Sequence, residues 1–407
     1  MRRDEARALD AADPLRAMRE RFVLPEGVIY LDGNSLGALP KATSPQLFDT
    51  VERQWGENLI TSWNKHGWID WPQRIAARLA PVVGASPSEL LIADSTSVCL
   101  FKLLASAIAA RPGRKTILTQ ERNFPTDLYV AQGLADMLGL QLRAVPAGSV
   151  ADAIDGDTAV VTLTHADYRT RAFHDMASIN ARAHESGALV LWDLSHSAGA
   201  LKLDLRGSGC HLAVGCGYKY LNGGPGAPAF IFVADRLQAE LRPPLQGWMG
   251  HSEPFAFEDS YRPASGIARF LTGTPSILAL AALDAGLATF DGCSMSDVEA
   301  KARALTQLFV DEVEARCGTE VQLVSPRDPA QRGSHVSFAH PQGYAVIQAL
   351  IACKVIGDFR APDLMRFAFA PLYNGYEDAW QAADALAEIL VTGEWDRDRF
   401  RQPQKVT

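Results

Sequence analysis

The chain has 407 residues, 47% of them hydrophobic and 21% charged, which is ordinary for a globular protein with a large core and a smaller second domain. Its net charge of −8 argues against binding to nucleic acid or to a membrane surface, because both favour basic patches. The six cysteines are scattered without a C-x-x-C pair or a short metal-ligand spacing, so we expect reduced thiols, a cytoplasmic location and no metal site. The first 21 residues lack the apolar core of a signal peptide, and no apolar run approaches the roughly 18 residues of a membrane span.

The first elements are a polar N-terminal helix and a short strand. Asp13-Pro14 fits the N-cap and first position of a helix, and residues 28–31 fit a strand. The following turn carries Asn34 and Ser35, which either form a tight turn or contact a substrate. Spacing alone favours the turn.

An aromatic-rich loop follows a helix predicted within residues 46–70. Such a cluster usually packs in a core or an interface. The alternative is a wall for a flat aromatic substrate, with Trp63 and His66 as the candidates. The aromatic and imidazole side chains of this region are Trp55, Trp63, His66, Trp68 and Trp71.

A predicted strand at residues 90–93 leads into a hydroxyl-rich stretch and a helix that runs to about residue 110. Free N–H groups and the helix dipole make such a helix N-terminus an anion site. An ordinary N-cap box would explain one hydroxyl but not three in a row, so Ser95 and Thr96 are candidate phosphate ligands.

Two further strands are predicted at residues 116–119 and 158–164. Phe124 and Asp127 lie in the loop after the first, and Thr164 ends the second. A helix at residues 175–185 then completes a β-α-β unit. From the residues alone, Phe124-Pro125 would simply anchor this loop.

The stretch from Trp192 to Gly226 carries the chemistry. Two buried strands deliver Asp193 and Lys219 to the carboxyl edge of a sheet, where open α/β folds bind ligands. His196 follows Asp193, Tyr218 precedes Lys219, and glycines follow. A lysine amine and an acidic partner are what pyridoxal 5′-phosphate (PLP) requires, for a Schiff base and for its pyridine nitrogen. The joint pattern predicts a PLP site rather than a surface lysine beside a capping aspartate.

The rest of the chain reads as a long functional loop at residues 245–275, a connecting helix at 276–290 and an α+β region. That region has predicted helices at 297–317, 345–353 and 377–392, and strands near 321–324, 335–339 and 364–370. Alternation places Arg366 on the face opposite Met365 and Phe367. A guanidinium there could grip a carboxylate through two hydrogen bonds, or could simply be solvated.

These motifs resemble the fold type I PLP enzymes, and within them the kynureninase family. The resemblance rests on residues 30–37 (YLDGNSLG), 124–127 (FPTD), the lysine-bearing stretch, 246–251 (QGWMGH) and 371–374 (PLYN). It implies an α/β fold with a mostly parallel, helix-covered sheet in a large domain at 51–285. A smaller α+β domain would span 286–407, and the segment 1–50 would pack with it.

The resemblance also implies hydrolysis of L-kynurenine to anthranilate and L-alanine by a homodimer with shared active sites. Lys219 would hold PLP and move protons, Asp193 would protonate the pyridine nitrogen, and Tyr218 would act as an acid or base. The chain has Thr274 rather than a larger amide side chain at this position, which favours the unhydroxylated substrate. Cofactor contacts would come from Ser95, Thr96, Phe124 stacked on the ring, Asp127, Thr164, His196, and from Trp248 and Thr274 of the neighbouring subunit; substrate contacts would come from Asn34, Ser35, Trp63, Thr274 and, for the carboxylate, Arg366.

Two alternatives and one departure complete the analysis. A cysteine desulfurase or class V aminotransferase shares the Asp, His and Lys residues, but a desulfurase needs a cysteine near residues 333–335, where none stands. A transcription regulator would need a basic helix-turn-helix, for which the short N-terminal segment leaves no room. The family commonly has glycine after Tyr-x-Thr, whereas Arg171 follows Tyr168-Arg169-Thr170 here, which leaves the geometry of this loop open.

Overall fold

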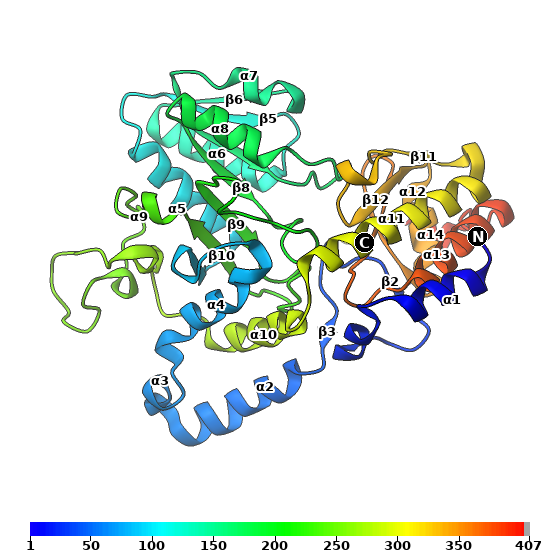
Figure 1. Ribbon diagram of the computed structural model, residues 1–407, viewed down its shortest axis with the longest axis horizontal. Helices are drawn as coiled ribbons and strands as arrows, with labels where there is room; N and C mark the ends of the chain where they lie inside the picture. The colour runs from blue at the N-terminus through cyan, green and yellow to red at the C-terminus, as the bar shows by residue number, and fades with distance from the viewer. Residues whose placement is uncertain (403–407) are drawn as a thin grey trace.

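Seven strands form the central sheet of the computed structural model, which describes residues 1–402 (Figure 1). Strand β10 is antiparallel to both of its neighbours, and the pairs among the other strands are parallel. The expected α/β fold with a mostly parallel sheet is therefore confirmed. In spatial order the strands are β4 (Leu90–Ala93), β10 (Ala229–Val233), β9 (Leu212–Cys216), β8 (Leu189–Asp193), β7 (Thr158–Thr164), β5 (Thr116–Gln120) and β6 (Gln141–Val145).

Helices pack against this sheet, and its strands β7, β8 and β9 are buried along their whole length, as expected for parallel strands. One large core joins the sheet to the helices. The helices of this region are α4 (Trp71–Val83), α5 (Thr96–Ala109), α6 (Pro125–Leu138), α7 (Val150–Ala153), α8 (Met176–Glu185), α9 (Asp235–Gln238) and α10 (Ile277–Leu287).

The predicted loop at Phe124 to Asp127 is the beginning of a helix instead. Phe124 is the N-cap of α6, and Pro125 occupies its first position, where a missing N–H costs nothing. Asp127 lies in the first turn. The residues alone predicted that Phe124-Pro125 anchors a loop, whereas this pair begins a helix.

A second sheet and a second core are built from the C-terminal part. The four strands β11 (Gln322–Leu323), β12 (His335–Ala339), β15 (Leu364–Ala368) and β14 (Asp358–Arg360) are antiparallel, in that order. The domain boundaries at 50/51 and 285/286 stay a prediction, which the two separate cores support. Helices α11 (Met295–Cys317), α12 (Gly343–Ala352), α13 (Tyr376–Thr392) and α14 (Asp398–Arg401) complete this part.

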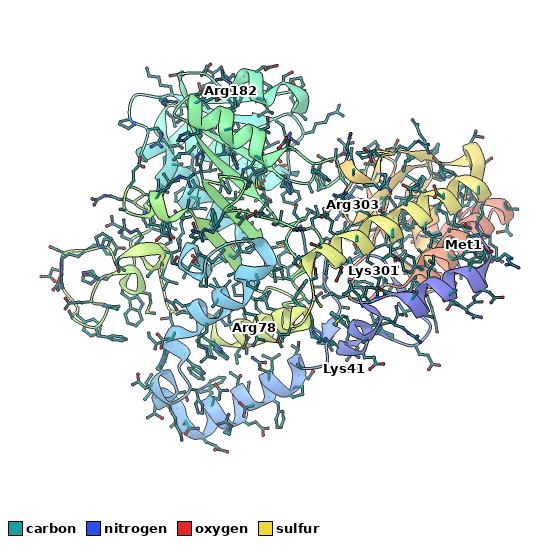
Figure 2. All side chains as sticks on the ribbon, in the orientation of Figure 1. Met1, Lys41, Arg78, Arg182, Lys301 and Arg303 are labelled. Atoms are coloured by element: carbon teal, nitrogen blue, oxygen red, sulfur yellow. The ribbon has the colours of Figure 1, made fainter. Side chains whose placement is uncertain are left out.

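The N-terminal segment lies beside the second sheet, where α1 (Arg3–Ala12) contacts α13 (Figure 1). The prediction that Asp13-Pro14 begins a helix was wrong, because α1 ends before it and only a short 3-10 helix (Arg16–Arg21) follows. Asp13 instead forms a buried ion pair with Lys301 of α11, at 2.6 Å (Figure 2). The short strands are β1 (Phe22–Val23), β3 (Leu39–Pro40), and the parallel pair β2 (Ile29–Tyr30) and β13 (Val355–Ile356).

An arm of helical turns extends below the central sheet in Figure 1. It comprises α2 (Thr43–Asp49), a π-helical turn (Thr50–Glu57) and α3 (Ser62–Lys65), in place of the single helix predicted within 46–70. The segment 245–275 contains only 3-10 turns at Trp248–Gly250 and Gly266–Phe270, as predicted.

Within residues 1–402 no single helix has the length and apolar composition to cross a membrane, although the bent pair Ile277–Phe290 and Met295–Glu320 would pass such a test together. In the same described residues, no cluster of three or more His, Cys, Asp or Glu side chains is arranged to hold a metal ion.

Candidate active site

Lys219 and Asp193 meet at one edge of the central sheet. Their strands, β8 and β9, are adjacent and parallel, so both carboxyl ends open on the same side. Lys219 Nζ lies 3.1 Å from His196 Nε2, and Asp193 Oδ1 accepts a hydrogen bond from Ser195 N at 2.7 Å. Asp193, His196 and Lys219 are all buried. The sequence prediction of a shared crevice for these three residues agrees with this geometry.

Burial shifts the pKa values of His196 and Asp193 beside Lys219. It lowers the pKa of His196 well below its ordinary value, and the Lys219 amine lowers it further, so His196 is neutral and can accept a hydrogen bond from Lys219. Burial likewise raises the pKa of the Asp193 carboxyl. A cationic partner would reverse that shift, because an opposite charge stabilises the carboxylate.

A second buried carboxylate stands beside Asp193. Burial raises the pKa of Asp127 well above its ordinary range, and the charge of Asp193 adds to the effect. Asp127 Oδ2 accepts a hydrogen bond from Thr164 Oγ1 at 3.2 Å, while Asp127 Oδ1 is buried without a partner. Phe124 lies next to the lysine, with Lys219 Nζ 5.7 Å from its ring centroid.

Asn123 organises this corner and was missed by the sequence analysis. Its Oδ1 accepts hydrogen bonds from Thr164 Oγ1 at 2.6 Å and from Phe124 N at 2.8 Å. One side chain therefore fixes both predicted cofactor contacts. The sequence signal that could have indicated Asn123 is an amide residue between the end of a predicted strand and Phe124-Pro125.

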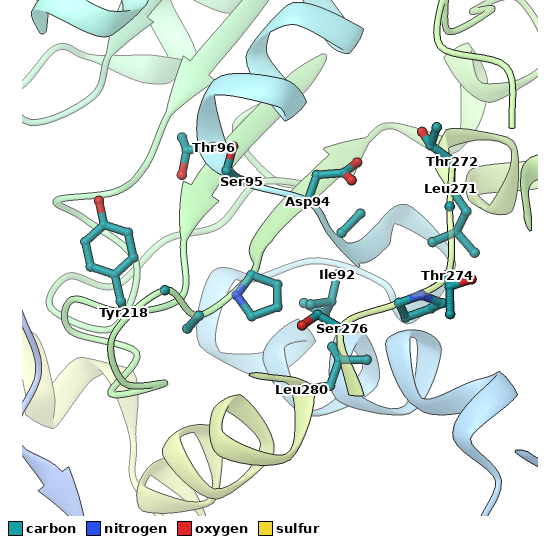
Figure 3. Close-up of a pocket in the computed structure, with 16 residues that line it drawn as sticks. Ile92, Asp94, Ser95, Thr96, Tyr218, Leu271, Thr272, Thr274, Ser276 and Leu280 are labelled. Carbon is teal, nitrogen blue, oxygen red and sulfur yellow. The ribbon is translucent and has the colours of Figure 1, made fainter. Parts of the chain in front are cut away.

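A pocket of about 320 Å³ opens at the N-terminus of α5 (Figure 3). Ser95, Thr96, Tyr218 and Thr274 all line it, although they come from distant parts of the chain. In the close-up, Ser95, Thr96 and Tyr218 stand on one side and Thr274 on the other. Ser95 caps α5 by accepting a hydrogen bond from Val98 N at 3.4 Å. The residues predicted to bind a phosphate therefore line a concavity with hydroxyl groups at a helix N-terminus, and their role in binding an anion stays a prediction.

The turn at Asp32 to Gly37 is brought against the lysine loop. Gly37 N donates to Tyr218 O at 2.8 Å, and a Cβ atom on Gly37 would lie 2.4 Å from Lys219 O, so only glycine fits here. Asn34 is buried with both amide atoms unpartnered, and Ser35 Oγ donates to Asp358 Oδ2 at 3.1 Å. Both the turn and a location beside the lysine loop are therefore observed.

Arg366 lies on the predicted face, opposite Met365 and Phe367, which belong to the second core. It is not solvated, however, since only 2% of it is exposed. Arg366 Nε donates to Asp358 Oδ1 at 2.6 Å, Nη2 donates to Asp358 Oδ2, and Nη1 donates to Tyr168 O at 2.6 Å. Asp358, which was not predicted from the sequence, holds the guanidinium in one orientation. Burial raises the pKa of the Asp358 carboxyl, but Arg366 outweighs this effect, so the net shift is downward.

Two predicted site residues, Trp248 and Trp63, lie apart from the lysine site, the pocket and Arg366 of their own chain. Trp248 is 40% exposed and packs edge-on against Phe255, with ring centroids 5.5 Å apart. Trp63 packs edge-on against Trp68 at 5.9 Å, in agreement with the packing alternative. Neither tryptophan lines the pocket of Figure 3.

Comparison with known proteins gives a relative over the whole length. A kynureninase from Pseudomonas fluorescens is 50% identical over 413 residues, which cover 100% of this chain and 99% of the relative. A family model of the kynureninase C-terminal domain matches residues 298–386. The chain belongs to the kynureninase family. A Burkholderia mallei kynureninase agrees, at 49% identity over 100% of this chain and 99% of its own.

Among solved structures, a cysteine desulfurase from Thermococcus onnurineus matches this kynureninase-family chain with a TM-score of 0.79. It is 19% identical and covers 92% of this chain and 98% of its own, so it shows a shared fold alone. Cysteine desulfurases, the alternative considered from the sequence, are therefore related to this chain only at the level of the fold.

The residues on the site fit PLP. A buried carboxylate adjoins the lysine, the unpartnered Asp127 Oδ1 and His196 Nδ1 point to a missing polar partner, and a hydroxyl-lined helix N-terminus suits a phosphate. This is the donor set that a pyridine ring with a phosphate arm requires.

Proposed function

We propose that this protein hydrolyses the Cβ–Cγ bond of L-kynurenine, giving anthranilate and L-alanine, with PLP as cofactor. Membership of the kynureninase family over the whole chain supports the reaction. The observation that carries the chemistry is the placement of Lys219 and Asp193 at adjacent strand ends, with His196 3.1 Å from the lysine amine.

Five residues would hold the cofactor. Lys219 would form the covalent link, Asp193 a charged hydrogen bond to the pyridine nitrogen, and Phe124 a stacking contact with the ring. Ser95 and Thr96 would bind the phosphate. When bound, PLP supplies an electron sink for negative charge that develops on substrate carbons. Burial raises the pKa of both Asp193 and Asp127, so a protonated pyridine nitrogen beside them would stabilise their charged form and be stabilised in return. Asp127, Thr164 and His196 would complete the cradle.

The chain's own groups handle protons. Neutral His196 accepts a hydrogen bond from Lys219 and so orients its amine, which would remove the proton from the substrate's α-carbon when free. Burial raises the pKa of Tyr218, so this hydroxyl stays protonated and serves as an acid. Tyr218 lies between the pocket and Lys219, with Nζ 5.8 Å from its ring centroid.

Arg366 would bind the substrate's α-carboxylate. Asp358 and Tyr168 O fix its orientation, so little side-chain entropy remains to be lost on binding. Asn34 and Ser35 would line the same end of the site. Replacing Arg366 with Ala should raise KM steeply and leave the spectrum of the bound cofactor unchanged.

We infer a homodimer in the cytoplasm. Large apolar side chains are exposed on the arm and on the 245–275 segment, and patches of this kind mark interfaces. All six cysteines are unpaired, which suits a reducing compartment. Trp248 and Trp63 would then reach a site only across the interface. The exposed side chains are Phe48, Val51, Trp55, Leu59 and Ile60 on the arm, and Trp248, Phe255 and Phe257 on the segment.

The test is the appearance of anthranilate fluorescence when L-kynurenine is added to the purified, PLP-loaded protein. A desulfurase would instead release sulfide from L-cysteine. Sulfide release without anthranilate would refute the proposal. A parallel assay with ring-hydroxylated kynurenine measures the preference that Thr274 suggests.

A further inference from the structure

Arg171 has an unusual environment for a cation. Its side chain is completely buried, and its backbone φ is +66°, a left-handed conformation that residues other than glycine rarely adopt. The backbone therefore keeps the conformation that a glycine would take. The loop that holds it lies across the polar face of the second sheet, through an isolated bridge between Ala172 and Arg332.

The guanidinium of Arg171 is left without a counter-charge. Nη2 donates to the carbonyl oxygen of His196, while Nε and Nη1 are buried with no partner. Nε lies against Gly333, where an added Cβ atom would be 2.3 Å away. Within residues 1–402, Arg171 forms no ion pair.

Three other buried cations within residues 1–402 have partners that compensate their charge or donors. Lys102 and Arg366 each have a carboxylate partner, and Arg332 makes four hydrogen bonds to neutral acceptors. Arg171 has one neutral acceptor and no carboxylate, and a buried charge compensated so little is destabilising. The combination of left-handed backbone and an unpaired buried charge indicates that an anion from outside the chain completes this position.

The surroundings of Arg171 identify the anion's location. The ring of Tyr220 lies 5.6 Å from Arg171 Cζ, and the charges of Arg171 and Arg366 both act on His335. The ring of His335 is 6.2 Å from that of His196, which contacts Lys219. These same neighbours of Arg171 carry further buried polar atoms without partners: His196 Nδ1, Tyr220 Oη and both ring nitrogens of His335.

We propose that Arg171 is a second arginine for the substrate's α-carboxylate, and that with Arg366 it selects amino acids that carry this group. The inference rests on the proposed role of Arg366. Asp358 engages Nε and Nη2 of Arg366, so a second guanidinium supplies donors and positive charge that Arg366 alone has already committed. Arg171 Nη1 provides the free donor.

The test measures binding rather than turnover. β-Benzoylpropionate has the aryl ketone and carboxylate of the substrate but no α-amine, so it cannot react, and its amide lacks the charge. Calorimetric titration of the PLP-loaded protein gives Kd for both. Arg171→Gly, which suits the left-handed backbone, should weaken binding of the carboxylate roughly 10- to 100-fold and change binding of the amide less than about twofold.

Two matched variants serve as controls. Arg169→Ala removes a half-buried cation from the same loop and should leave both Kd values unchanged. Arg171→Lys keeps the charge but not the fork, and should lose part of the carboxylate preference. It also provides the measurement if the glycine variant does not retain PLP.

Equal weakening of both ligands by Arg171→Gly, or no weakening, overturns the inference and leaves Arg171 a structural role. Thermal unfolding of parent and Arg171→Gly with and without sodium chloride provides a further readout. A carboxylate preference unchanged by Arg171→Gly, together with stabilisation by chloride that only the parent shows, overturns the inference in favour of an inorganic anion. A protein that binds the carboxylate through Arg171 but makes no anthranilate would refute the proposed reaction alone.

Discussion

Buried Lys102 of α5 forms an ion pair with Asp94, with Nζ 2.5 Å from Oδ2, and Asp94 lines the same pocket as Ser95 and Thr96. The same amine donates to Phe270 O at 2.5 Å, so it ties the start of α5 to the 245–275 segment. Asp94 has a φ of +42°, and the ion pair holds this strained residue in place.

Replacing Lys102 with Met should leave Asp94 charged, without its partner. Breaking a fully buried pair by removing one partner typically costs about 3–5 kcal/mol of the free energy of unfolding, and because Asp94 is 31% exposed the loss here should lie at or below the lower end of that range. PLP affinity should fall as well, because the loop at Ser95 loses its support. Denaturant unfolding and PLP titration measure both effects. An unchanged midpoint would show that the pair contributes nothing, and Lys65→Met, on the exposed arm, is the control.

Replacing Lys219 with Ala removes the amine proposed to hold PLP. We expect the visible absorbance of the covalently bound cofactor to disappear after dialysis, and turnover to fall by several orders of magnitude. Lys202→Ala changes another lysine near the centre of the chain and should leave the spectrum intact. A retained band with normal turnover would exclude Lys219.

Asp32 should make stability depend on pH. Burial and the neighbouring charge of Asp358 raise its pKa to about 7, above its ordinary value of 3.8, and Oδ1 is buried without a partner. The folded state therefore holds a proton that the unfolded chain releases. This contribution is complete below about pH 4 and is lost as the pH rises through about 7.

Asp32→Asn mimics the protonated carboxyl and should unfold at a higher denaturant concentration than the parent at pH 8. The gap should close towards pH 4, at roughly 1.4 kcal/mol for each unit of pKa difference. Denaturant titrations at a series of pH values check the slope. A gap that is constant with pH would show that Asp32 does not titrate in this range.

Trp248 is predicted to act in the neighbouring subunit's site, since it is exposed and lies outside its own chain's pocket. Two inactive proteins are mixed, Lys219→Ala and Trp248→Ala, and their subunits are allowed to exchange. If the sites are shared, one site of each mixed dimer carries both changes and the other carries neither, so activity returns. A mixture that stays inactive would assign Trp248 to its own subunit.

Thr274 needs the same experiment. It was also expected to serve the neighbour, yet it lines the pocket of its own chain with Thr96 and Tyr218. A variant of Thr274 that is complemented by Lys219→Ala would place it across the interface despite this geometry.

The sequence by itself determined the elements that carry local signals. Buried apolar runs predicted β4, β7, β8 and β9, and their carboxyl ends placed Asp193 beside Lys219, because parallel neighbours share an edge. The hydroxyl run at Ser95 predicted a helix N-terminus for the same kind of reason, since capping is a local interaction.

Only the tertiary structure decided which charged side chains have partners. Arg366 lies eight residues from Asp358, but only the turn between β14 and β15 brings the two together. Arg171 is unremarkable in the sequence apart from the family's glycine. Its missing counter-charge becomes visible only when the loop lies against the second sheet, because burial and the absence of a partner are properties of the packed chain.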